Sequence, residues 1–484
     1  MERSSARQKI ELLLDRNTFQ EFDALVESRK GKFISHDLRH GDGIHIGVGT
    51  IQGRRVCVFS EDSTYMGGTS GEEHSKKLSK IIALARKSKV PLIGFLSSGG
   101  GRIQEGILSM EVTSKALREF ILLSGYIPTI TVACGVCAGG AAYLVASSDF
   151  TYMVEQESVM LLTGPKVIEK VLQEQCTKEE LGGTYVHSVV TGNASVVVSS
   201  EMEVYSGIRS LLTYLPDYFG QVPSSISYMP TAKDRRMALS DIIPDDANKG
   251  YDVFDIIKEI IDEDSFYEIN ANFAPNLIVG LVRIGGRNIG IIANQPLCLG
   301  GSIDNDALKK SARFQQLCDA YGIPLLFMVD SPGILPGKEQ ERNGLITNGA
   351  KLFHILATIT VPRITIITRR AIGGAFGVMN PKGMGADLNL AWHCAEIAVV
   401  GSDASLDIIF AKEAQRHPHP QQFLEEQKEA FKHQFLHPYE AAKFGYIDEV
   451  IFPEDTRIKL LRAYSMLENK VETLPPKKRN IIPM

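Results

Sequence analysis

Residues 127–143 read IPTITVACGVCAGGAAY, and residues 361–376 read VPRITIITRRAIGGAF. In each stretch an apolar run that follows a proline leads into a Gly-Gly-Ala turn, and the two turns lie 234 positions apart. A short apolar run bounded by Pro on one side and Gly on the other is typical of a buried strand. The sequence therefore predicts two equivalent strands, each of which enters a helix through a pair of glycines.

Other motifs recur at nearly the same offset. The Gly-Gly pair at 67–68 is matched by the pair at 300–301, 233 positions later. A near-constant offset over several motifs indicates two copies of one domain. We expect the first copy over residues 1–235 and the second over residues 236–484.

Helices and strands alternate within each copy. Helical spacing predicts helices over His74–Lys87 and Asp306–Ala320, and each of them precedes a short apolar run, at 92–96 and at 325–329. This alternation is typical of βα units and predicts an α/β fold.

The composition narrows the choice of partners. The net charge is −5, the pI is about 6.2 and there is no long basic run, so we expect neither nucleic acid nor a membrane surface as a partner. Residues 120–148 carry no charged side chain and are numerous enough to cross a bilayer. However, this segment contains Pro and several Gly, and its counterpart carries Arg363, Arg369 and Arg370, which indicates a buried core segment instead.

The N-terminus and the cysteines bear on the compartment. The first residues lack the apolar core that a signal peptide needs. The seven cysteines are an odd number without framework spacing, which suggests reduced thiols. We expect a cytoplasmic protein.

The two Gly-Gly-Ala turns are the candidate functional sites. A strand that enters a helix through glycines leaves the first backbone N–H groups of the helix open to a ligand, because no Cβ blocks the approach. Such preorganised donors suit an oxyanion. A single Gly-Gly pair would more often serve close packing of a helix on a sheet, but the duplication after equivalent strands favours a site.

A second Gly-rich segment lies upstream of each turn, SSGGGRIQEG at 97–106 and DSPGILPG at 330–337. The first lacks the Gly-Lys-Ser/Thr ending of a phosphate loop and the spacing of a dinucleotide motif, so both interpretations are weak. Glu105 is either a general base or a carboxylate that favours a helix dipole, and the second role is the commoner one.

Two further patterns resemble metal or redox motifs. Cys134 and Cys137 have the spacing of a redox or zinc pair, but no second pair completes a site, so core packing is favoured. His417 and His419 have no carboxylate or thiol cluster nearby and are expected in an exposed loop. We expect no metal site.

In this order, the turns resemble those of the carboxyltransferase β-subunits of propionyl-CoA and acetyl-CoA carboxylases, and the similarity runs nearly end to end. The motifs that carry it are KIELLLD (9–15), FQEFDAL (19–25), RIQEG (102–106), CAGGA (137–141), ELGG (180–183), ANQP (293–296), ILPG (334–337), GADLNLAW (385–392) and PPKK (475–478). The resemblance implies two tandem crotonase-like domains of the ββα superhelix type. It also implies a homohexamer of two stacked rings of three, with active sites where the first domain of one chain meets the second domain of another.

The same resemblance assigns roles to the turns. Gly139 and Gly140 would hold the thioester oxyanion of an acyl-CoA, and the N–H groups of the second turn would hold the ureido oxygen of biotin. The remaining implied site residues are Gly374 and Ala375 for that second role, Gly99, Gly100, Gly101, Arg102, Ala138, Ala141 and Gly377 for the substrate, and Gly373 and Phe376 for biotin.

The implied reaction moves a carboxyl group from carboxybiotin to the α-carbon of an acyl-CoA thioester. Backbone donors would stabilise charge on both oxygens, so no protein base is required. The sequence contains neither a Met-Lys-Met biotin-acceptor motif nor an ATP-binding module. A biotin carboxylase and a separate biotin carboxyl carrier protein are therefore the expected partners. A four-cysteine zinc ribbon is also missing, which favours the propionyl/acyl type.

Two departures from the family pattern bear on the substrate. Gly377 stands where propionyl-type enzymes usually carry Asp, which predicts an enlarged pocket wall and a substrate bulkier or more polar than propionyl-CoA. Residues 97–101 read SSGGG where DSGGA is usual, so the contacts of the first loop stay open. The alternatives are a decarboxylase or transcarboxylase subunit that moves carboxyl from a malonyl-type CoA to biotin, a hydratase of the same fold, and a non-catalytic CoA-binding scaffold.

Overall fold

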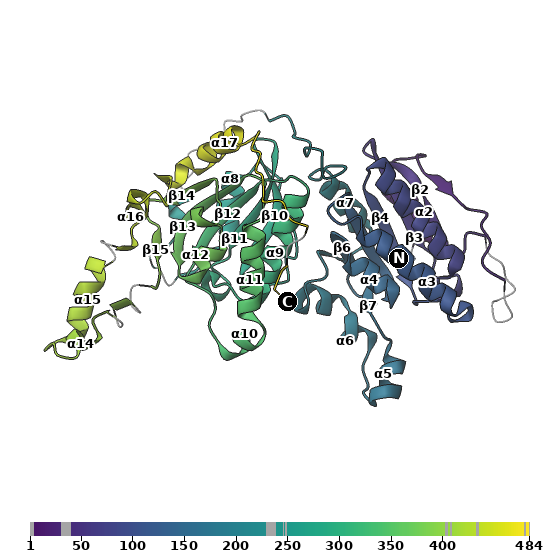
Figure 1. The fold of residues 1–484 in the computed structure, drawn as a ribbon, viewed down its shortest axis with the longest axis horizontal. Helices are drawn as coiled ribbons and strands as arrows, with labels where there is room; N and C mark the ends of the chain where they lie inside the picture. Colours follow the sequence, from purple (N-terminus) through teal and green to yellow (C-terminus); the bar gives the residue numbers. More distant parts are fainter. Residues whose placement is uncertain are drawn as a thin grey trace. The chain divides into compact units, whose positions relative to one another are not determined.

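The computed structural model describes residues 4–30, 40–228, 239–244, 246, 249–401, 405–406, 409–431, 435–478 and 481–483. The chain forms two compact units, Met1–Pro223 and Ser224–Met484, and each has its own sheet (Figure 1). The boundary expected between residues 235 and 236 lies outside the described residues.

The sheet of the first unit runs in the order β1-β2-β3-β4-β5-β6-β8, and β7 pairs with β5. Its strands are β1 (Gln20–Phe22), β2 (Ile44–Ile51), β3 (Arg54–Glu61), β4 (Leu92–Ser98), β5 (Thr129–Ala138), β6 (Phe150–Val154), β7 (Val159–Leu161) and β8 (Val196–Val198). The hairpin β2–β3 is antiparallel, and the pairs from β3 onward are parallel.

The second unit repeats this plan in the order β9-β10-β11-β12-β13-β14-β16, and β15 pairs with β13. Its strands are β9 (Tyr267–Glu268), β10 (Leu277–Ile284), β11 (Arg287–Asn294), β12 (Leu325–Ser331), β13 (Arg363–Ile372), β14 (Leu388–Trp392), β15 (Glu396–Ala398) and β16 (Glu449–Ile451). Even the register shift recurs, between Leu96 and Ser98 in β4 and between Val329 and Ser331 in β12. The predicted α/β fold in two copies is confirmed.

Helices cover both sheets. The first unit has α1 (Ala6–Leu13), α2 (Glu72–Ser88), α3 (Ile107–Ile121), α4 (Gly140–Ala146), α5 (Pro165–Leu172), α6 (Lys178–Gly182), the π-helical turn η3 (Val186–Val190) and α7 (Glu201–Leu212). The second has α8 (Val253–Ile260), α9 (Asn305–Ala320), α10 (Lys338–Arg342), α11 (Leu345–Leu356), α12 (Gly374–Val378), α14 (Ala411–Ala414), α15 (Pro420–Phe431), α16 (Pro438–Lys443) and α17 (Thr456–Met466). The helices predicted over His74–Lys87 and Asp306–Ala320 are confirmed as α2 and α9.

The central strands form the core. Strand β12 is buried at every position and β4 at all but one, as expected for parallel strands that are covered on both faces. The uncharged segment 120–148 contains the end of α3, strand β5 and helix α4. Within the described part of the chain, no helix is long and apolar enough to cross a membrane.

The repeated Gly-Gly pairs have a steric cause. Gly68 and Gly301 have φ angles of 66° and 80°, a region that favours glycine. A Cβ at Gly68 would overlap the carbonyl oxygen of Ser97, and one at Gly301 would overlap that of Asp330. Each pair therefore lets its loop lie directly against the end of β4 or β12, the strand that leads into the Gly-rich segment.

A buried lysine occurs at the same position of both units. The Nζ of Lys77 donates to the carbonyl oxygens of Gly41, at 2.9 Å, and Ile44, at 2.5 Å. The Nζ of Lys310 donates to those of Phe273, at 2.7 Å, and Ala274, at 3.4 Å. Burial lowers the pKa of each lysine from 10.5 to about 8. Each ammonium ties down the loop before its hairpin.

These lysines predict how stability depends on pH. Because the folded-state pKa of Lys310 is lowered to about 8, the buried charge costs most below pH 8, and the cost is relieved as pH rises toward the ordinary value of 10.5. Stability should therefore rise over this window, by at most about 1.4 kcal/mol per pH unit for each lysine. Lys310→Met should flatten the pH dependence of the melting temperature relative to wild type, whereas Lys309→Met, at the exposed neighbour, should not. Equal slopes in both variants would contradict the assignment.

Candidate active site

The first glycine of each turn is fixed by a short strand. Gly139 and Gly373 have φ angles of 58° and 59° and precede the helices α4 and α12. The N–H of Gly139 donates to the carbonyl oxygen of Leu161 in β7, at 3.1 Å, and the N–H of Gly373 donates to that of Ala398 in β15, at 2.9 Å. The prediction that Gly139 is an oxyanion donor therefore needs correction, because its N–H is already bonded to Leu161.

The next two N–H groups of each turn are open. Among the described residues, no hydrogen bond is formed by the N–H groups of Gly140 and Ala141, or by those of Gly374 and Ala375. They are the first donors of α4 and α12, which have no acceptor one helical turn earlier. Each unit thus presents a pair of adjacent donors at the positive end of a helix, an arrangement that suits an oxygen carrying negative charge.

The glycines also keep the turns narrow. A Cβ at Gly140 would lie 3.0 Å from Cγ2 of Thr113, and one at Gly374 would lie 2.8 Å from Cδ1 of Ile334. A Cβ at Gly139 would lie 3.9 Å from the Cα of Gly100, so the first turn lies directly beside the Gly-rich loop. Ala138, the last residue of β5, connects the strand to this turn.

The Gly-rich loop adds one more open donor in each unit. The N–H of Gly99 donates to the carbonyl oxygen of Gly67, at 2.9 Å, and the N–H of Gly100 to Oγ of Ser98, at 3.2 Å. The N–H of Gly101 has no partner among the described residues. Of the three predicted glycines, Gly101 is therefore the one that can donate to a ligand. The N–H of Ile334 is open in the same way in the second unit.

Arg102 is buried in ion pairs. Its side chain is fully buried and its Nη1 lies 2.7 Å from the carboxylate of Asp42 and 2.8 Å from that of Glu105. Its Nη2 donates to the carbonyl oxygen of Thr69, at 2.9 Å. The prediction that Arg102 binds substrate is wrong for its side chain, because a guanidinium in two buried ion pairs has no free face for a ligand. It holds the end of the Gly-rich loop.

Glu105 is likewise structural. Its other carboxylate oxygen accepts the N–H of Glu72 at 2.6 Å, so it caps α2, a helix far away in sequence. The other end of the loop is tied down by Glu61, whose carboxylate accepts the N–H of Ser97 at 2.9 Å. The general-base alternative for Glu105 is therefore disfavoured, since the group is buried, ion-paired and bonded to backbone. The carboxylate does favour a helix dipole, but the helix is α2.

The second unit holds its turn with a different set of charges. The buried carboxylate of Asp330 accepts Nε of Arg369, at 2.9 Å, and Nε of Arg370, at 2.8 Å. The guanidinium of Arg369 lies 5.0 Å from the ring centre of Tyr251. Two arginines of β13, four and three residues before Gly373, thus bind the end of β12, a contact that the sequence did not predict.

Gly377 has a neighbour that fills part of its space. A Cβ at Gly377 would lie 3.2 Å from Cζ of Phe353 in α11. Gly377 lies three residues after Gly374, so both share one face of α12, and Phe376 lies between them. The expected enlargement is therefore incomplete, because the phenyl ring takes up room that a missing side chain leaves. Two apolar side chains, Phe353 and Ile334, thus lie next to the second turn.

Among the described residues, the cysteine and histidine motifs form neither a ready thiolate nor a metal cluster. Burial raises the pKa of Cys134 to about 12 and that of Cys137 well above its usual range, so neither is a ready thiolate. His417 bonds to the backbone of His419 in an exposed segment. No cluster of three or more metal-ligating side chains occurs among the described residues.

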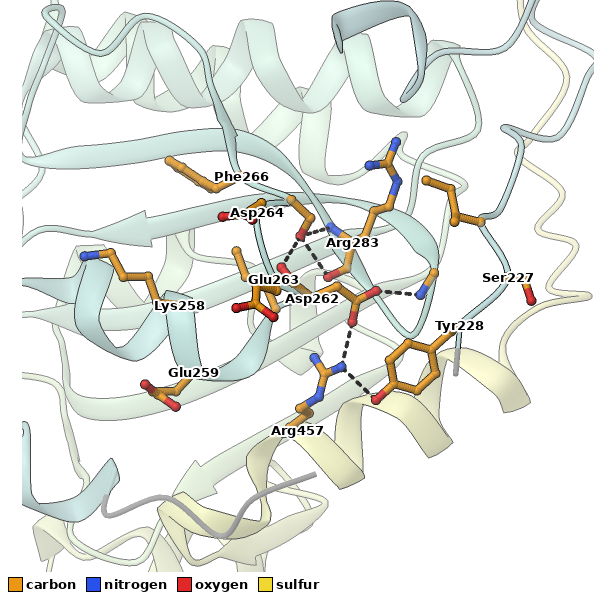
Figure 2. A pocket seen from close by; sticks show the side chains of 14 residues that line it. Ser227, Tyr228, Lys258, Glu259, Asp262, Glu263, Asp264, Phe266, Arg283 and Arg457 are labelled. Carbon is orange, nitrogen blue, oxygen red and sulfur yellow. Dashed lines mark hydrogen bonds and ion pairs between the residues drawn. The ribbon is translucent and has the colours of Figure 1, made fainter. Parts of the chain in front are cut away.

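A cavity of about 830 Å³ lies elsewhere in the second unit (Figure 2). Arg457 lines this cavity, and its Nη2 lies 2.6 Å from the carboxylate of Asp262 and 3.2 Å from the hydroxyl of Tyr228. None of its lining residues belongs to the turns or to the Gly-rich loops. The donor sets described above therefore lie outside this cavity.

Comparison with known proteins identifies the family. The model of the carboxyl transferase domain family matches residues 1–482. A Bacillus subtilis protein provisionally named a propionyl-CoA carboxylase beta chain is 44% identical over 99% of this chain and 94% of its own length. The acetyl-/propionyl-coenzyme A carboxylase beta5 subunit of Mycobacterium leprae is 42% identical over 99% of this chain and 90% of its own.

The fold is that of a solved relative. The transcarboxylase 12S structure, a hexamer with methylmalonyl-coenzyme A and methylmalonic acid bound, superposes with a TM-score of 0.96 at 38% identity, over 100% of this chain and 92% of its own. The predicted tandem crotonase-like architecture and the predicted family are thereby confirmed. The chain belongs to the carboxyl transferase family, as the carboxyltransferase component of a biotin-dependent acyl-CoA carboxylase that moves a carboxyl group between biotin and an acyl-CoA.

Proposed function

We propose that the first turn binds the thioester carbonyl oxygen of the acyl-CoA and that the second binds the ureido oxygen of biotin. The observation that supports this division is the pair of open N–H groups in each unit, Gly140 with Ala141 and Gly374 with Ala375. Both ligands present an oxygen that gains negative charge during the reaction, so two similar donor sets suit them. Gly101 supplies a third donor beside the first turn.

The donors act on the transition state. When the α-proton leaves the acyl group, the negative charge moves onto the thioester oxygen, and the N–H groups of Gly140 and Ala141 stabilise it there. Because these amides are fixed by α4 and β5, they need no reorganisation when the charge appears. Histidine, aspartate and cysteine side chains are not needed at the turn for this role.

The second turn fits the biotin head group on the same grounds. Its two open amides lie close to Ile334, and a Cβ at Gly374 would crowd this side chain. Biotin supplies the carrier of the carboxyl group and the base that takes the α-proton. The residues of this chain hold the ureido oxygen and stabilise the charge that it gains.

We further propose that six copies of this chain assemble, as the transcarboxylase 12S does, and that the first unit of one copy faces the second unit of another. The biotin would then arrive on a carrier protein that also visits a biotin carboxylase. The structural similarity to this hexamer over the whole chain supports the same assembly.

The direction of transfer is tested with the isolated chain. The purified protein is incubated with free biotin and a panel of malonyl-type CoA esters, and the decarboxylated product is followed by mass spectrometry. Turnover of one ester identifies the acyl group and supports the carboxyltransferase function. Complete absence of turnover on every ester would favour the scaffold alternative. Adding a biotin carboxylase, ATP, bicarbonate and the uncarboxylated acyl-CoA then separates net carboxylation from transcarboxylation.

The two apolar side chains next to the second turn predict the acyl preference. In the proposed assembly the second turn of one copy faces the acyl-CoA bound by another, so Phe353 and Ile334 would favour an apolar acyl group over a more polar one. Gly377→Asp should raise kcat/KM for methylmalonyl-CoA relative to that for a malonyl-type ester with a bulkier apolar acyl group by about 10-fold or more, because the added side chain takes up room and replaces an apolar contact. Because a Cβ at 377 would lie 3.2 Å from Phe353, Gly377→Asp should also lower turnover of every ester, and Phe353→Leu in the same chain should relieve the crowding and restore it. Phe353→Leu alone is the matched control. An unchanged ratio in all three variants would contradict the proposal.

A further inference from the structure

Strand β7 is three residues long, yet it fixes the first turn. Its residues Val159–Leu161 pair with the end of β5, and the carbonyl oxygen of Leu161 accepts the N–H of Gly139 at 3.1 Å. Successive carbonyls of a strand point to opposite sides. The carbonyl of Met160 therefore points away from β5, on the outer side of a very short strand. Whatever holds this oxygen also holds the turn in place.

His187 holds that oxygen. Its Nε2 lies 2.9 Å from the carbonyl oxygen of Met160, a residue that is 3% exposed. A carbonyl only accepts, so Nε2 carries the proton. The other ring nitrogen, Nδ1, lies 3.2 Å from Oγ1 of Thr191 and 3.3 Å from Nδ2 of Asn193, both of which can donate. The neutral ring with the proton on Nε2 thus satisfies every contact.

The backbone around His187 is shaped to make this contact. His187 lies in η3, a π-helical turn, a form that often occurs at functional sites. A Cβ at Gly182 would overlap the carbonyl oxygen of Met160 and would lie 3.2 Å from Nε2 of His187. The end of α6 therefore approaches β7 closely only because residue 182 is glycine, and the imidazole reaches the same oxygen from the next turn.

We propose that His187 is a positioning residue for the carboxyl transfer, which acts through Met160 and Leu161 of β7 on the first turn. This rests on the proposed role of Gly140 and Ala141 at the thioester oxygen. The imidazole fixes β7, β7 fixes Gly139, and Gly139 aims the two open amides. His187 does not act as a base, because its proton-bearing nitrogen is bonded to Met160 and the other faces two donors.

The expected signature is a loss of rate without a loss of substrate binding. His187→Ala leaves a buried carbonyl without its donor, and a displacement of the amides by about 1 Å is enough to lower the rate by about 10²-fold. We expect kcat for a malonyl-type CoA ester to fall by about 10- to 10²-fold, and the Kd of the ester, from calorimetry, to change by less than about 3-fold. His187→Gln should restore most of kcat, since its amide Nε2 can donate to the same carbonyl.

Two further variants make the test decisive. Gly182→Ala pushes on the same carbonyl sterically and should reproduce the loss in kcat. His45→Ala removes another half-buried histidine of the first unit, which pairs with Glu21 on strands remote from β5 in the sheet, and should leave kcat unchanged. Equal activity of His187→Ala and wild type, with intact melting temperature, would overturn the inference. If Gly140→Pro also had no effect, the proposed role of the turn would fail as well, whereas an effect of Gly140→Pro alone would remove only the role of His187.

Discussion

Gly140→Pro is expected to lower kcat for a malonyl-type CoA ester by about 10²–10³-fold, the usual cost of removing one oxyanion donor. Residue 140 is the first residue of α4, and proline is tolerated there because its missing N–H has no helical partner. The substitution thus deletes the donor and leaves the helix in place. The loss should appear in kcat, while the Kd of the ester stays within a few-fold, because the charge that the amide stabilises develops only in the transition state.

The control keeps the amide and adds only the side chain. Gly140→Ala brings a Cβ to 3.0 Å from Cγ2 of Thr113, as proline also does, but retains the N–H. It should therefore keep most of the activity. If the alanine and proline variants lost activity equally, crowding of Thr113 rather than a lost donor would explain the result. A proline variant within a few-fold of wild type would show that the amide of Gly140 does not hold the thioester.

The fold was accessible from the sequence because of its repeat. The Pro-bounded apolar runs and the Gly-Gly pairs mark the same strands twice, and each signal supports the other. The pairs at 67–68 and 300–301 recur for a steric reason, since only glycine avoids overlap with the carbonyls of Ser97 and Asp330. Where a close backbone contact admits only glycine, that glycine is visible in the sequence. In this chain it is visible at both copies of the position.

The contacts within the site were less accessible. Arg102 follows three glycines and suggests a ligand contact, but its partner Asp42 lies sixty positions earlier, and nothing local announces the ion pair. The N–H of Gly139 is likewise bonded to Leu161, a residue in a strand too short to be predicted. Whether a donor is open depends on such distant acceptors. Residue type and spacing therefore located the turns. Only the structure shows that the N–H of Gly139 is bonded whereas that of Gly140 is open.

The sequence indicated only part of the difference between the two turns. Gly377 departs from the family pattern, which pointed to the wall beside the second turn, yet Phe353 lies in a different helix and shares no motif with it. The same holds for Asp330, which binds two arginines from the next strand. A missing side chain is visible in a sequence, whereas the side chain that takes its place is visible only in the packing.

Gly374→Pro is expected to lower the biotin-dependent rate by about 10²-fold while leaving the binding of the CoA ester unchanged. Residue 374 is the first residue of α12, so proline again removes an open amide at a position that tolerates it. The proposed division of labour requires that this amide stabilise charge on the ureido oxygen and make no contact with the thioester. The deficit should therefore appear in the dependence of the rate on free biotin, and calorimetry with the CoA ester should match wild type.

Comparison of the two proline variants then separates the two turns. Alanine and proline at 374 both place a Cβ 2.8 Å from Cδ1 of Ile334, so Gly374→Pro and its matched control Gly374→Ala are compared in the same Ile334→Val background. If the turns act on different oxygens of one transition state, the free-energy losses of Gly140→Pro and Gly374→Pro should add in the double variant, because the two donors share no partner. A double variant no slower than either single one would mean that both turns serve a single oxygen, and the division between thioester and biotin would be wrong.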